Sequence, residues 1–388
     1  MDKSKWEYKK LGEVANCQIG LTYKPTDVVD DGGTIVLRSS NIQENKIALD
    51  DIVRVNCNIN PSKYVNDGDI LMCSRNGSFR LVGKVAKIKN LAEPMSYGAF
   101  MTIIRSIYND FLFYFFLSHS FRKQIFVGQT ATINQITTKM LNNISMALPP
   151  IADQQRIVAE LDCLNEMIAL KQEQLKEFDK LAQSIFYDMF GDPISNSKKW
   201  ETIKLEKITK AEGGGTPSKN NPDYWGGEIA WVTSKDMKQM YISDSQIHIT
   251  EAGVNNSPAH ILPKGTILLV NRSGILKHTL PLALTTKEVT INQDLKALTI
   301  TDERFLSLFV LYTLKGFAPY LLSRVKAVTV DSIEFSVFKK LEIPLPPLAL
   351  QQQFAEKIQA IEAQKELVKQ SIAETQHLLD SRMDYYFD

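Results

Sequence analysis

Residues 148–190 read LPPIADQQRIVAELDCLNEMIALKQEQLKEFDKLAQSIFYDMF, and residues 345–387 read LPPLALQQQFAEKIQAIEAQKELVKQSIAETQHLLDSRMDYYF. Both segments begin with Leu-Pro-Pro and carry paired glutamines at the same place, at a displacement of 197 positions. In each, one stripe of positions recurs at alternating intervals of four and three residues, the period of a coiled-coil seam. The seam positions are Ile157, Leu161, Leu164, Ile168, Lys171, Leu175, Phe178, Ala182, Ile185 and Met189 in the first segment, and Phe354, Ile358, Ile361, Lys365, Val368, Ile372, Thr375, Leu379, Arg382 and Tyr386 in the second.

A helix with so narrow an apolar stripe needs a partner, because the stripe alone would remain in water. We expect each segment to form one long helix and the two helices to pair with each other in antiparallel. The prolines suit the first turn, and about 37 residues at 1.5 Å each give a rod of roughly 55 Å. The pattern alone also fits a coiled coil that joins two chains, and this alternative stays open.

The duplication continues outside the helices. Trp6 opens the first repeat as Trp200 opens the second, and GDILMCSRNG from Gly68 matches GTILLVNRSG from Gly265. Each of these stretches reads as an apolar strand that ends in a small polar loop with one arginine. Before the long helices, Thr132 aligns with Thr329 and Ile136 with Ile333, and the apolar runs 111–117 and 305–314 read as short helices.

The repeat predicts an α+β protein with two β-rich domains, separated by two long antiparallel coiled-coil helices. We expect four parts, in which the two β-rich domains alternate with the two helical segments: 1–147, 148–192, 193–344 and 345–388. A length of 388 residues suits two globular domains plus the helices.

Composition narrows the class of protein. The chain is 44% hydrophobic, but no stretch reaches 18 uninterrupted apolar residues, and the first ten residues are polar and charged. We therefore expect a cytoplasmic protein without a membrane span. The four cysteines all lie in the first half and the five histidines are scattered, so we expect no disulfide and no structural metal. We also expect no cofactor.

The net charge of +1 conceals a partition between the parts. Residues 1–147 hold 18 Lys and Arg against 13 Asp and Glu, and residues 193–344 hold 19 against 15. The helical segments are acidic, with 4 against 9 in 148–192 and 4 against 7 in 345–388. A polyanion would therefore bind the β-rich domains, although surpluses this small also occur in ordinary surfaces.

Matched strands with divergent loops are typical of scaffolds that present loops to a target, because loops tolerate change and carry recognition. The loop side chains are of the types that pair with base edges and phosphates in a DNA groove. Each of them is also an ordinary residue for a solvated turn. The candidate DNA-binding residues are Arg38, Ser40, Asn41, Arg75, Asn76, Arg80 and Lys84 in the first domain, and Ser234, Lys235, Arg272, Ser273 and Lys277 in the second.

The chain resembles the specificity subunits of type I restriction-modification systems. The resemblance rests on LPPI and LPPL followed by paired glutamines, on the long helices, on DMFGDP at 188–193, and on a two-fold repeat over almost all of the chain. It implies two target-recognition domains that each read half of a bipartite site on double-stranded DNA. It also implies that the helices dock methyltransferase subunits, with two as the expected number, and that restriction subunits join the full complex.

The resemblance implies a subunit without catalytic activity of its own. The alternative is a stand-alone DNA methyltransferase or nuclease with a dimerising coiled coil. Asn221-Pro222-Asp223-Tyr224 is close to an adenine methyltransferase loop but lacks its second proline, so we interpret it as a turn. No Walker loop is present.

The paired glutamines are the candidate partner-binding residues. An amide side chain both donates and accepts hydrogen bonds, and the pair recurs near each helix start. We expect Gln154, Gln155, Gln351 and Gln352 to lie on outward helix faces and to contact the methyltransferase subunits.

Overall fold

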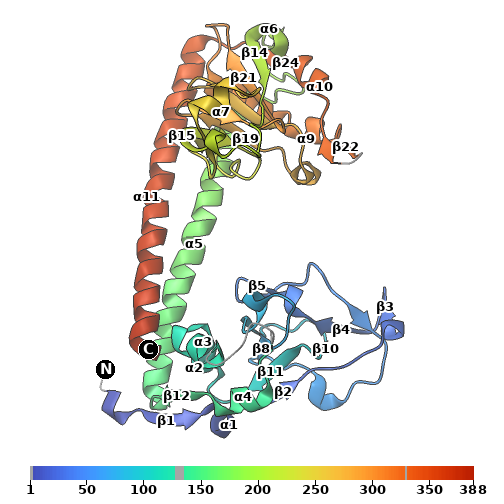
Figure 1. Ribbon diagram of the computed structural model, residues 1–388, viewed down its shortest axis with the longest axis vertical. Coiled ribbons are helices and arrows are strands. Elements are labelled where there is room, and N and C mark those ends of the chain that lie inside the picture. The colour runs from blue at the N-terminus through green and yellow to red at the C-terminus, as the bar shows by residue number, and fades with distance from the viewer. Residues whose placement is uncertain (1–2, 127–134, 328–329) are drawn as a thin grey trace. The chain divides into compact units, whose positions relative to one another are not determined.

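The computed structural model describes residues 3–126, 135–327 and 330–388 (Figure 1). The chain divides into two compact units by its internal contacts. Unit 1 contains Met1–Gln172 and Lys369–Asp388, and unit 2 contains Glu173–Val368. Each unit therefore contains part of both long helices. Thr132 and Thr329, aligned above, lie outside the described residues.

The two long helices are α5 (Ile151–Phe190) and α11 (Leu348–Phe387), and each has 40 residues. Both begin at the residue after the second proline, whereas the prolines were predicted to lie within the first turn. The carbonyl of Pro150 accepts from the N–H groups of Asp153 and Gln154 at 2.9 and 3.0 Å. Pro347 does the same for Leu350 and Gln351, so each proline supplies the first acceptor of its helix.

The helices pair in antiparallel within each unit, as predicted. In unit 1, Lys171 Nζ donates to Thr375 Oγ1 at 2.8 Å, and Tyr386 Oη donates to Glu160 Oε2 at 2.5 Å. Positions earlier in α5 thus meet positions later in α11. In unit 2, Lys365 Nζ lies 2.8 Å from Asp179 Oδ1. All twenty predicted seam positions are buried or half-buried, so the seam is occupied within one chain.

Unit 1 contains two four-stranded sheets. One has the order β2-β11-β8-β9 and is antiparallel throughout, and the other has the order β10-β4-β7-β3, with β4 and β10 parallel. Strand β8 is a continuous run of buried residues because both of its faces are covered. The strands are β1 (Glu7–Lys10), β2 (Asn16–Ile19), β3 (Val28–Val29), β4 (Thr34–Leu37), β5 (Ile42–Gln43), β6 (Lys46–Ile47), β7 (Arg54–Val55), β8 (Ile70–Cys73), β9 (Val85–Lys87), β10 (Met95–Tyr97), β11 (Met101–Arg105) and β12 (Ser145–Leu148). The shorter helices are α1 (Leu11–Val14), α2 (Asn109–Leu117), α3 (His119–Phe126) and α4 (Thr138–Asn143).

Unit 2 repeats this plan. Its main sheet has the order β14-β21-β18-β19-β16, and its second sheet, β17-β15-β20, again contains a parallel pair. The predicted duplication is therefore present in the topology. The strands are β13 (Thr202–Lys204), β14 (Thr209–Gly213), β15 (Trp225–Val232), β16 (Tyr241–Ile242), β17 (His248–Ile249), β18 (Ile267–Val270), β19 (Leu282–Thr285), β20 (Thr290–Ile291), β21 (Leu295–Ile300), β22 (Lys326–Ala327), β23 (Asp331–Ser332) and β24 (Glu342–Pro344). The shorter helices are α6 (Leu205–Ile208), α7 (Glu251–Asn255), α8 (Ser307–Gly316), α9 (Ala318–Leu322) and α10 (Phe335–Lys339).

An aromatic helix joins each set of sheets to the helix pair of its own unit. In unit 1, α2 packs against α11 through Phe111 and Phe387, whose ring centroids are 5.1 Å apart. In unit 2, α8 packs against α5 and α11 through Phe309 on Phe190 at 4.8 Å and Tyr312 on Phe354 at 5.0 Å. These are the short helices predicted from the runs 111–117 and 305–314.

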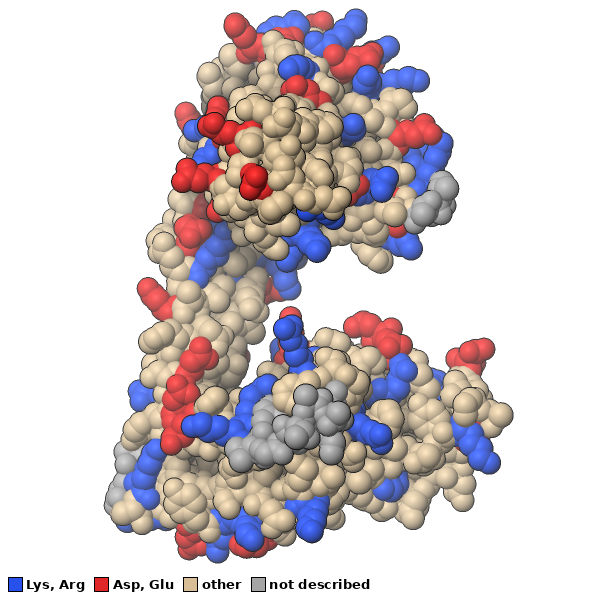
Figure 2. Space-filling view, viewed as in Figure 1, with Lys and Arg blue, Asp and Glu red and all other residues tan. Residues whose placement is uncertain are grey.

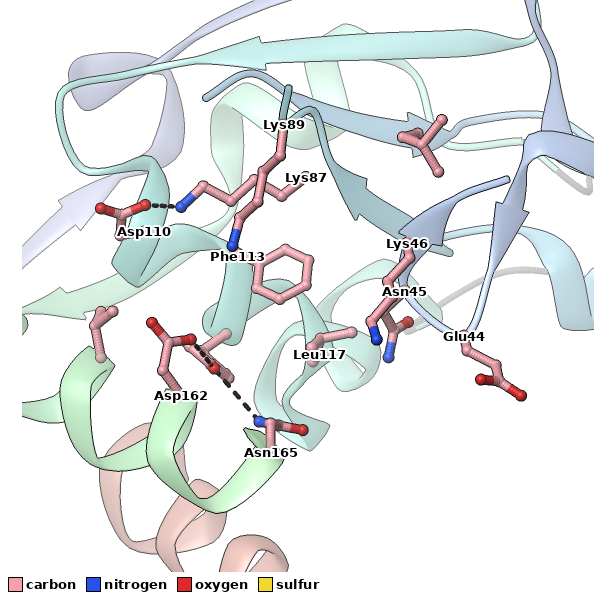
Figure 3. Close-up of a pocket in the computed structure, with 13 residues that line it drawn as sticks. Glu44, Asn45, Lys46, Lys87, Lys89, Asp110, Phe113, Leu117, Asp162 and Asn165 are labelled. Atoms are coloured by element: carbon pink, nitrogen blue, oxygen red, sulfur yellow. Dashed lines mark hydrogen bonds and ion pairs between the residues drawn. The ribbon is translucent and has the colours of Figure 1, made fainter. Parts of the chain in front are cut away.

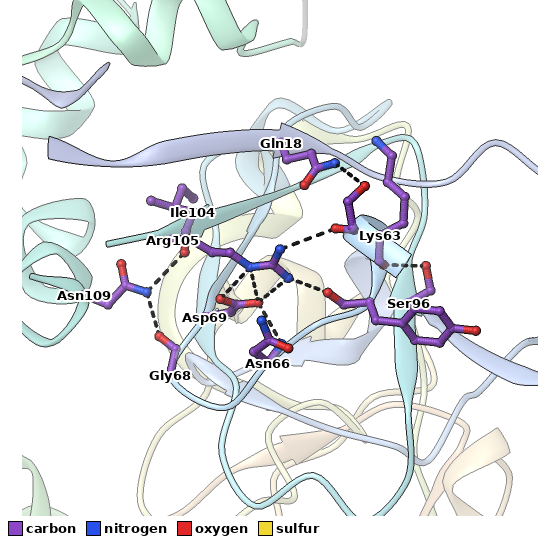
Figure 4. Close-up of polar contacts among 11 residues, drawn as sticks. Gln18, Lys63, Asn66, Gly68, Asp69, Ser96, Ile104, Arg105 and Asn109 are labelled. Atoms are coloured by element: carbon purple, nitrogen blue, oxygen red, sulfur yellow. Dashed lines mark hydrogen bonds and ion pairs between the residues drawn. The ribbon is translucent and has the colours of Figure 1, made fainter. Parts of the chain in front are cut away.

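A buried ion pair closes the main sheet of unit 1 (Figure 4). Arg105, at the end of β11, donates Nε to both oxygens of Asp69 at 3.0 Å, and Asp69 also accepts from the N–H of Asn66 at 2.8 Å. The guanidinium also donates to the carbonyls of Ser62 and Tyr64. The Asp69 side chain is 5% exposed, so this network holds a charge that would otherwise be buried and unpaired.

Charge is mixed over the surface. On the face shown in Figure 2, Lys and Arg side chains are interspersed with Asp and Glu over both units. Binding of a polyanion would therefore depend on particular loops, described below. Among the described residues, no helix is long and apolar enough to cross a membrane.

Candidate nucleic-acid interface

The loop after β8 and the loop after β18 have the same backbone hydrogen bonds. In unit 1, the N–H groups of Ser74 and Arg75 donate to the carbonyl of Phe100 at 2.9 and 3.0 Å. In unit 2, Asn271 and Arg272 donate to the carbonyl of Asp294 at 2.9 and 3.1 Å. Phe100 and Asp294 are therefore equivalent positions, each directly before the strand that pairs with β8 or β18.

A second segment fixes each loop from the other side. Ile136 donates its N–H to the carbonyl of Ser74 at 2.7 Å, and Ile333 donates to that of Asn271 at 3.1 Å. Isolated bridges join Arg75 to Gln135 and Arg272 to Ser332. Because the backbone is held on both sides, the two arginine side chains project from equivalent, fixed positions, and both are exposed.

The side chains around the two arginines differ. The guanidinium carbon of Arg75 lies 5.3 Å from the centroid of the Phe100 ring, a cation–π geometry. Arg272 Nε instead lies 3.4 Å from Asp294 Oδ1. The same backbone therefore presents a guanidinium stacked on an aromatic ring in unit 1 and a guanidinium beside a carboxylate in unit 2.

The loop after β4 lies next to the Arg75 loop. Asn76 Nδ2 donates to Ser39 Oγ at 3.0 Å, which ties the two loops together. Arg38 is half-buried and donates to Asp51 Oδ2 at 3.0 Å, and Ser40 is half-buried beside it. A cleft of about 550 Å³ in unit 1 is lined by Arg38, Ser39, Ser40, Asp51 and Phe100.

Asn41 requires a correction. It is 1% exposed, and its side chain accepts from the N–H of Arg38 at 2.8 Å and donates to the carbonyls of Ala48 and Asp51, both at 2.9 Å. All of these bonds hold the loop together. The prediction that Asn41 presents its amide to a DNA groove is therefore wrong, because the amide is used inside the loop.

The remaining candidates of unit 1 lie further along the chain after Arg75. Arg80 is exposed, in a short turn at Phe79–Leu81. Lys84 is half-buried, and its backbone carbonyl accepts from the N–H of Cys73 at 2.8 Å as the chain enters β9. Both belong to the segment that follows the Arg75 loop.

In unit 2, Ser234 and Lys235 lie in a turn closed by Asp236. The carboxylate of Asp236 accepts from the N–H and the hydroxyl of Thr233, both at 2.8 Å, and Lys235 is exposed at the tip. Lys235 thus projects from a turn whose conformation is fixed by local hydrogen bonds.

The other unit 2 candidates lie near carboxylates. Lys277 Nζ is 3.8 Å from Asp331 Oδ2, a longer contact than that of Arg272 with Asp294. Ser273 Oγ accepts from the N–H of Ile275 at 3.4 Å and so caps the following turn. The positive charges of this loop are therefore partly compensated within the unit.

A second cavity of unit 1, of about 390 Å³, lies between β6, β9, α2 and α5 (Figure 3). Lys87 forms an ion pair with Asp110, and Tyr114 Oη donates to Asp162 Oδ1 at 2.5 Å. Burial lowers the pKa of Lys87. Glu44, Lys46 and Lys89 line the same cavity.

The four glutamines divide into two classes. Gln154 and Gln351 are buried, and each donates Nε2 to the carbonyl of the first proline before its helix, at 2.7 and 3.0 Å. The prediction that they lie on outward faces is wrong, because their amides fix the helix starts. Gln155 and Gln352 are exposed.

The Asn221–Tyr224 stretch forms a turn, as predicted from its missing second proline. Asn221 caps a short helical turn at Pro222–Tyr224 and accepts from the N–H of Asp223 at 3.1 Å. In the part of the chain that the structure describes, no three His, Cys, Asp or Glu side chains converge as a metal site would require.

Phe100 and Asp294 were missed as candidates by sequence reasoning. The repeat aligns at a displacement of 197 for the arginine loops and 194 for these two positions, because unit 2 is three residues shorter between the strands. Alignment at the shorter displacement would have paired the aromatic residue with the acid.

Both repeats match a known protein family. The family model described as "Type I restriction modification DNA specificity domain" matches residues 3–179 and 197–377, one match for each repeat. The chain is 30% identical to the type I restriction enzyme EcoR124I/EcoR124II specificity subunit of Escherichia coli over 61% of its own length and 59% of that protein's. It is 24% identical to the EcoKI specificity subunit of Escherichia coli strain K12, over 70% and 62% of the two chains. The matches thus span about three fifths of these relatives.

Two solved structures share the fold. A chain from a structural study of complex assembly and conformational transition of the type I R-M system is 19% identical and superimposes with a TM-score of 0.59, over 98% of this chain and 97% of that one. The S subunit of a type I restriction-modification system from M. genitalium is 12% identical, with a TM-score of 0.53 over 99% and 96%. Since the family model covers both repeats and the fold is shared over nearly the whole length, the chain belongs to the specificity-subunit family of type I restriction-modification systems.

Proposed function

We propose that this chain reads DNA sequence for a type I restriction-modification complex and has no catalytic activity of its own. Residues 1–147 read one short half-site of double-stranded DNA, and residues 193–344 read another. The observation that carries the proposal is the pair of equivalent loops after β8 and β18, which have the same backbone hydrogen bonds but different side chains. A scaffold repeated in this way provides two DNA-binding domains of different sequence specificity.

In the proposal, one arginine contacts a base in each half-site. Its planar guanidinium donates two parallel hydrogen bonds to O6 and N7 of guanine, the commonest specific contact in the major groove. Arg75 and Arg272 are both exposed, and both project from loops held on two sides. The half-sites therefore each contain guanine, and they differ because the neighbouring side chains differ.

In this proposal α5 and α11 are the spacer between the half-sites. A 40-residue helix is about 60 Å long, and base pairs stack at about 3.4 Å, so the half-site centres lie within roughly 18 base pairs. The acidic helical segments contact no bases. The target is therefore bipartite and asymmetric, with an unread stretch in the middle.

The same helices dock the catalytic partners. Two methyltransferase subunits bind near the two equivalent helix starts, where Gln155 and Gln352 are exposed, and restriction subunits complete the assembly in the cytoplasm. Gln154 and Gln351 contribute indirectly, because they fix the conformation of each start.

The test is binding selection from random double-stranded DNA with the full chain, alone and with its methyltransferase subunits. We expect two short motifs at a constant separation. A continuous motif, or no sequence enrichment in either preparation, contradicts the proposal. Titration of the chain alone with S-adenosylmethionine, monitored by calorimetry, tests the alternative of a stand-alone methyltransferase, which requires the cofactor to bind without partners.

A further inference from the structure

Phe100 is an exposed apolar side chain in the cleft of unit 1 that polar side chains such as Arg38 and Ser39 also line. Its side chain is 57% exposed, and it lines the 550 Å³ cleft together with Thr22, Tyr23 and Ser39. A single exposed apolar residue is common on protein surfaces and by itself indicates nothing. Three further observations distinguish this one.

The first is that the backbone that carries the ring is held in place. The carbonyl of Phe100 accepts from both Ser74 and Arg75, and the N–H of Met101, the next residue, donates to Gly98 at 2.8 Å. The backbone is therefore fixed at the residue and after it. A ring on such a backbone binds with little loss of conformational entropy.

The second is the Arg75 guanidinium over the ring, with 5.3 Å between the guanidinium carbon and the ring centroid. Within the described residues, Arg75 forms no ion pair with a carboxylate, and its guanidinium lies over the Phe100 ring. Stacking on a flat surface orients the planar guanidinium and leaves its N–H edge free for an acceptor.

The third is the substitution at the equivalent position of unit 2. There Asp294 replaces the ring, its Oδ1 lies 3.4 Å from Arg272 Nε, and its Oδ2 accepts from Asn292 Nδ2 at 3.2 Å. Asp294 positions its arginine by charge, whereas Phe100 positions its arginine by stacking and also leaves an apolar edge exposed. An apolar edge beside a guanine-reading arginine matches the one apolar group in the major groove, the C5-methyl of thymine.

We infer that Phe100 is a specificity-determining residue that contacts the methyl group of a thymine adjacent to the guanine read by Arg75. The inference rests on the proposed function, since it needs a DNA half-site bound by unit 1. Asp294 offers no such surface, so the half-site of unit 2 has no thymine read in this way.

The experiment uses the full chain with its methyltransferase subunits and the duplex found by binding selection. Each thymine of the unit 1 half-site is replaced in turn by deoxyuridine, which removes only the methyl group. One position next to the guanine should weaken binding about 4-fold, the value of one buried methyl group. Phe100→Ala should lose at least this factor on the thymine duplex, because Arg75 also loses the ring on which it stacks, and should no longer distinguish thymine from deoxyuridine at that position.

Two further variants sharpen the result. Phe100→Asp reproduces the unit 2 arrangement, so it should abolish the methyl discrimination while Arg75 keeps its guanine preference. Ile107→Ala, which removes another exposed apolar side chain of unit 1, should leave both properties unchanged. A half-site without thymine beside the guanine overturns the inference, as does a Phe100→Ala variant that keeps the full deoxyuridine penalty. If selection yields no bipartite motif with the wild type, the proposed function itself fails, which is a different result.

Discussion

In unit 1 the end of β11 is tied to the loop before β8 by the Arg105–Asp69 ion pair, whereas in unit 2 the equivalent positions are Thr299 and Thr266, whose hydroxyl oxygens are 3.2 Å apart. The strands pair in the same register in both units. The same backbone is therefore held by a charged pair in unit 1, Arg105 and Asp69, and by a neutral pair in unit 2, Thr299 and Thr266; each pair is called the clasp of its unit. The difference indicates that the backbone hydrogen bonds define the scaffold. The two side chains that contact each other across it can be replaced, provided that both are replaced together.

The loops show the same division. The backbone donors of Arg75 and Arg272 find the same carbonyl acceptors, while the side-chain neighbour changes from an aromatic ring to a carboxylate. A duplicated reader can therefore change its chemistry at one position without losing its loop conformation. The following predictions test how far the two units are equivalent.

The largest effect is expected at the clasp. Arg105→Ala leaves the Asp69 carboxylate buried without its partner, which costs about 3 to 5 kcal/mol. Thr299→Ala removes one hydroxyl contact and should cost about 1 kcal/mol. Hydrogen exchange followed by mass spectrometry measures each effect locally, in peptides from β8 and β11 for the first variant and from β18 and β21 for the second.

The control for the clasp replaces the ion pair of unit 1 by the two threonines of unit 2. The double variant Asp69→Thr with Arg105→Thr introduces the unit 2 pair into unit 1 and should be more stable than Arg105→Ala alone, because no charge is left buried. Equal protection in the single and double variants would show that the ion pair is solvated in solution.

The next effect concerns the buried glutamines. The Gln351 amide accepts from the N–H of Leu306 at 2.9 Å and donates to the carbonyls of Arg304 and Pro346. Among the described residues, the side-chain amide of Gln154 bonds to the carbonyl of Pro149 alone. Gln351→Ala should therefore lower the free energy of unfolding by about 2 to 3 kcal/mol and Gln154→Ala by about 1 kcal/mol, measured by urea denaturation.

Their exposed neighbours provide a matched control. Gln155→Ala and Gln352→Ala should each change stability by less than about 0.5 kcal/mol. If these two side chains dock methyltransferase subunits, the double variant should show less assembled complex by native mass spectrometry. An unchanged assembled mass would assign them to the solvated helix surface.

Much of the fold could be predicted because it repeats. The 3.5-residue period specified both helices and their seam, and two copies in one chain indicated the intramolecular pair. The loops were harder, because a sequence pattern does not show which polar side chains are used internally. Asn41 and Gln154 were expected at the surface, but each satisfies backbone groups nearby. Phe100 was overlooked because the displacement that aligns the arginine loops does not pair it with Asp294.

The recognition arginines should give effects of about 1 to 3 kcal/mol each on DNA binding, if each makes a bidentate contact with guanine. Arg75→Ala should relax the sequence preference in one half-site and Arg272→Ala in the other. Binding selection with each variant measures this directly. If both substitutions alter the same half-site, recognition is not divided between the units.

The smallest predicted effect is the difference in stability loss between substitutions of two seam lysines, Lys365 and Lys171. Lys365 Nζ contacts Asp179 and Glu362 at 2.8 and 2.9 Å, whereas the partners of Lys171 Nζ within the described residues are neutral, Thr375 Oγ1 and the carbonyl of Ser371. Lys365→Met should cost about 1 kcal/mol, because Asp179 is 69% exposed and remains solvated after its partner is lost. Lys171→Met should change stability by less than about 0.5 kcal/mol, because the Thr375 hydroxyl keeps its own bond to Ser371.

The pH dependence of the stability loss in Lys365→Met shows whether that loss comes from the charge of the lysine. Burial lowers the pKa of Lys365, but hydrogen bonds to Asp179 and Glu362 outweigh it, so the pKa is raised above its ordinary value. A raised pKa contributes stability that is fully present below the unfolded value of about 10.4 and is lost as the pH rises through the folded value. Urea denaturation should therefore show the wild type more stable than Lys365→Met at pH 7, with the difference shrinking above pH about 10.4. A difference that stays constant at high pH would instead assign the effect to packing of the lysine stem in the seam, because the stem is unaffected by loss of the proton.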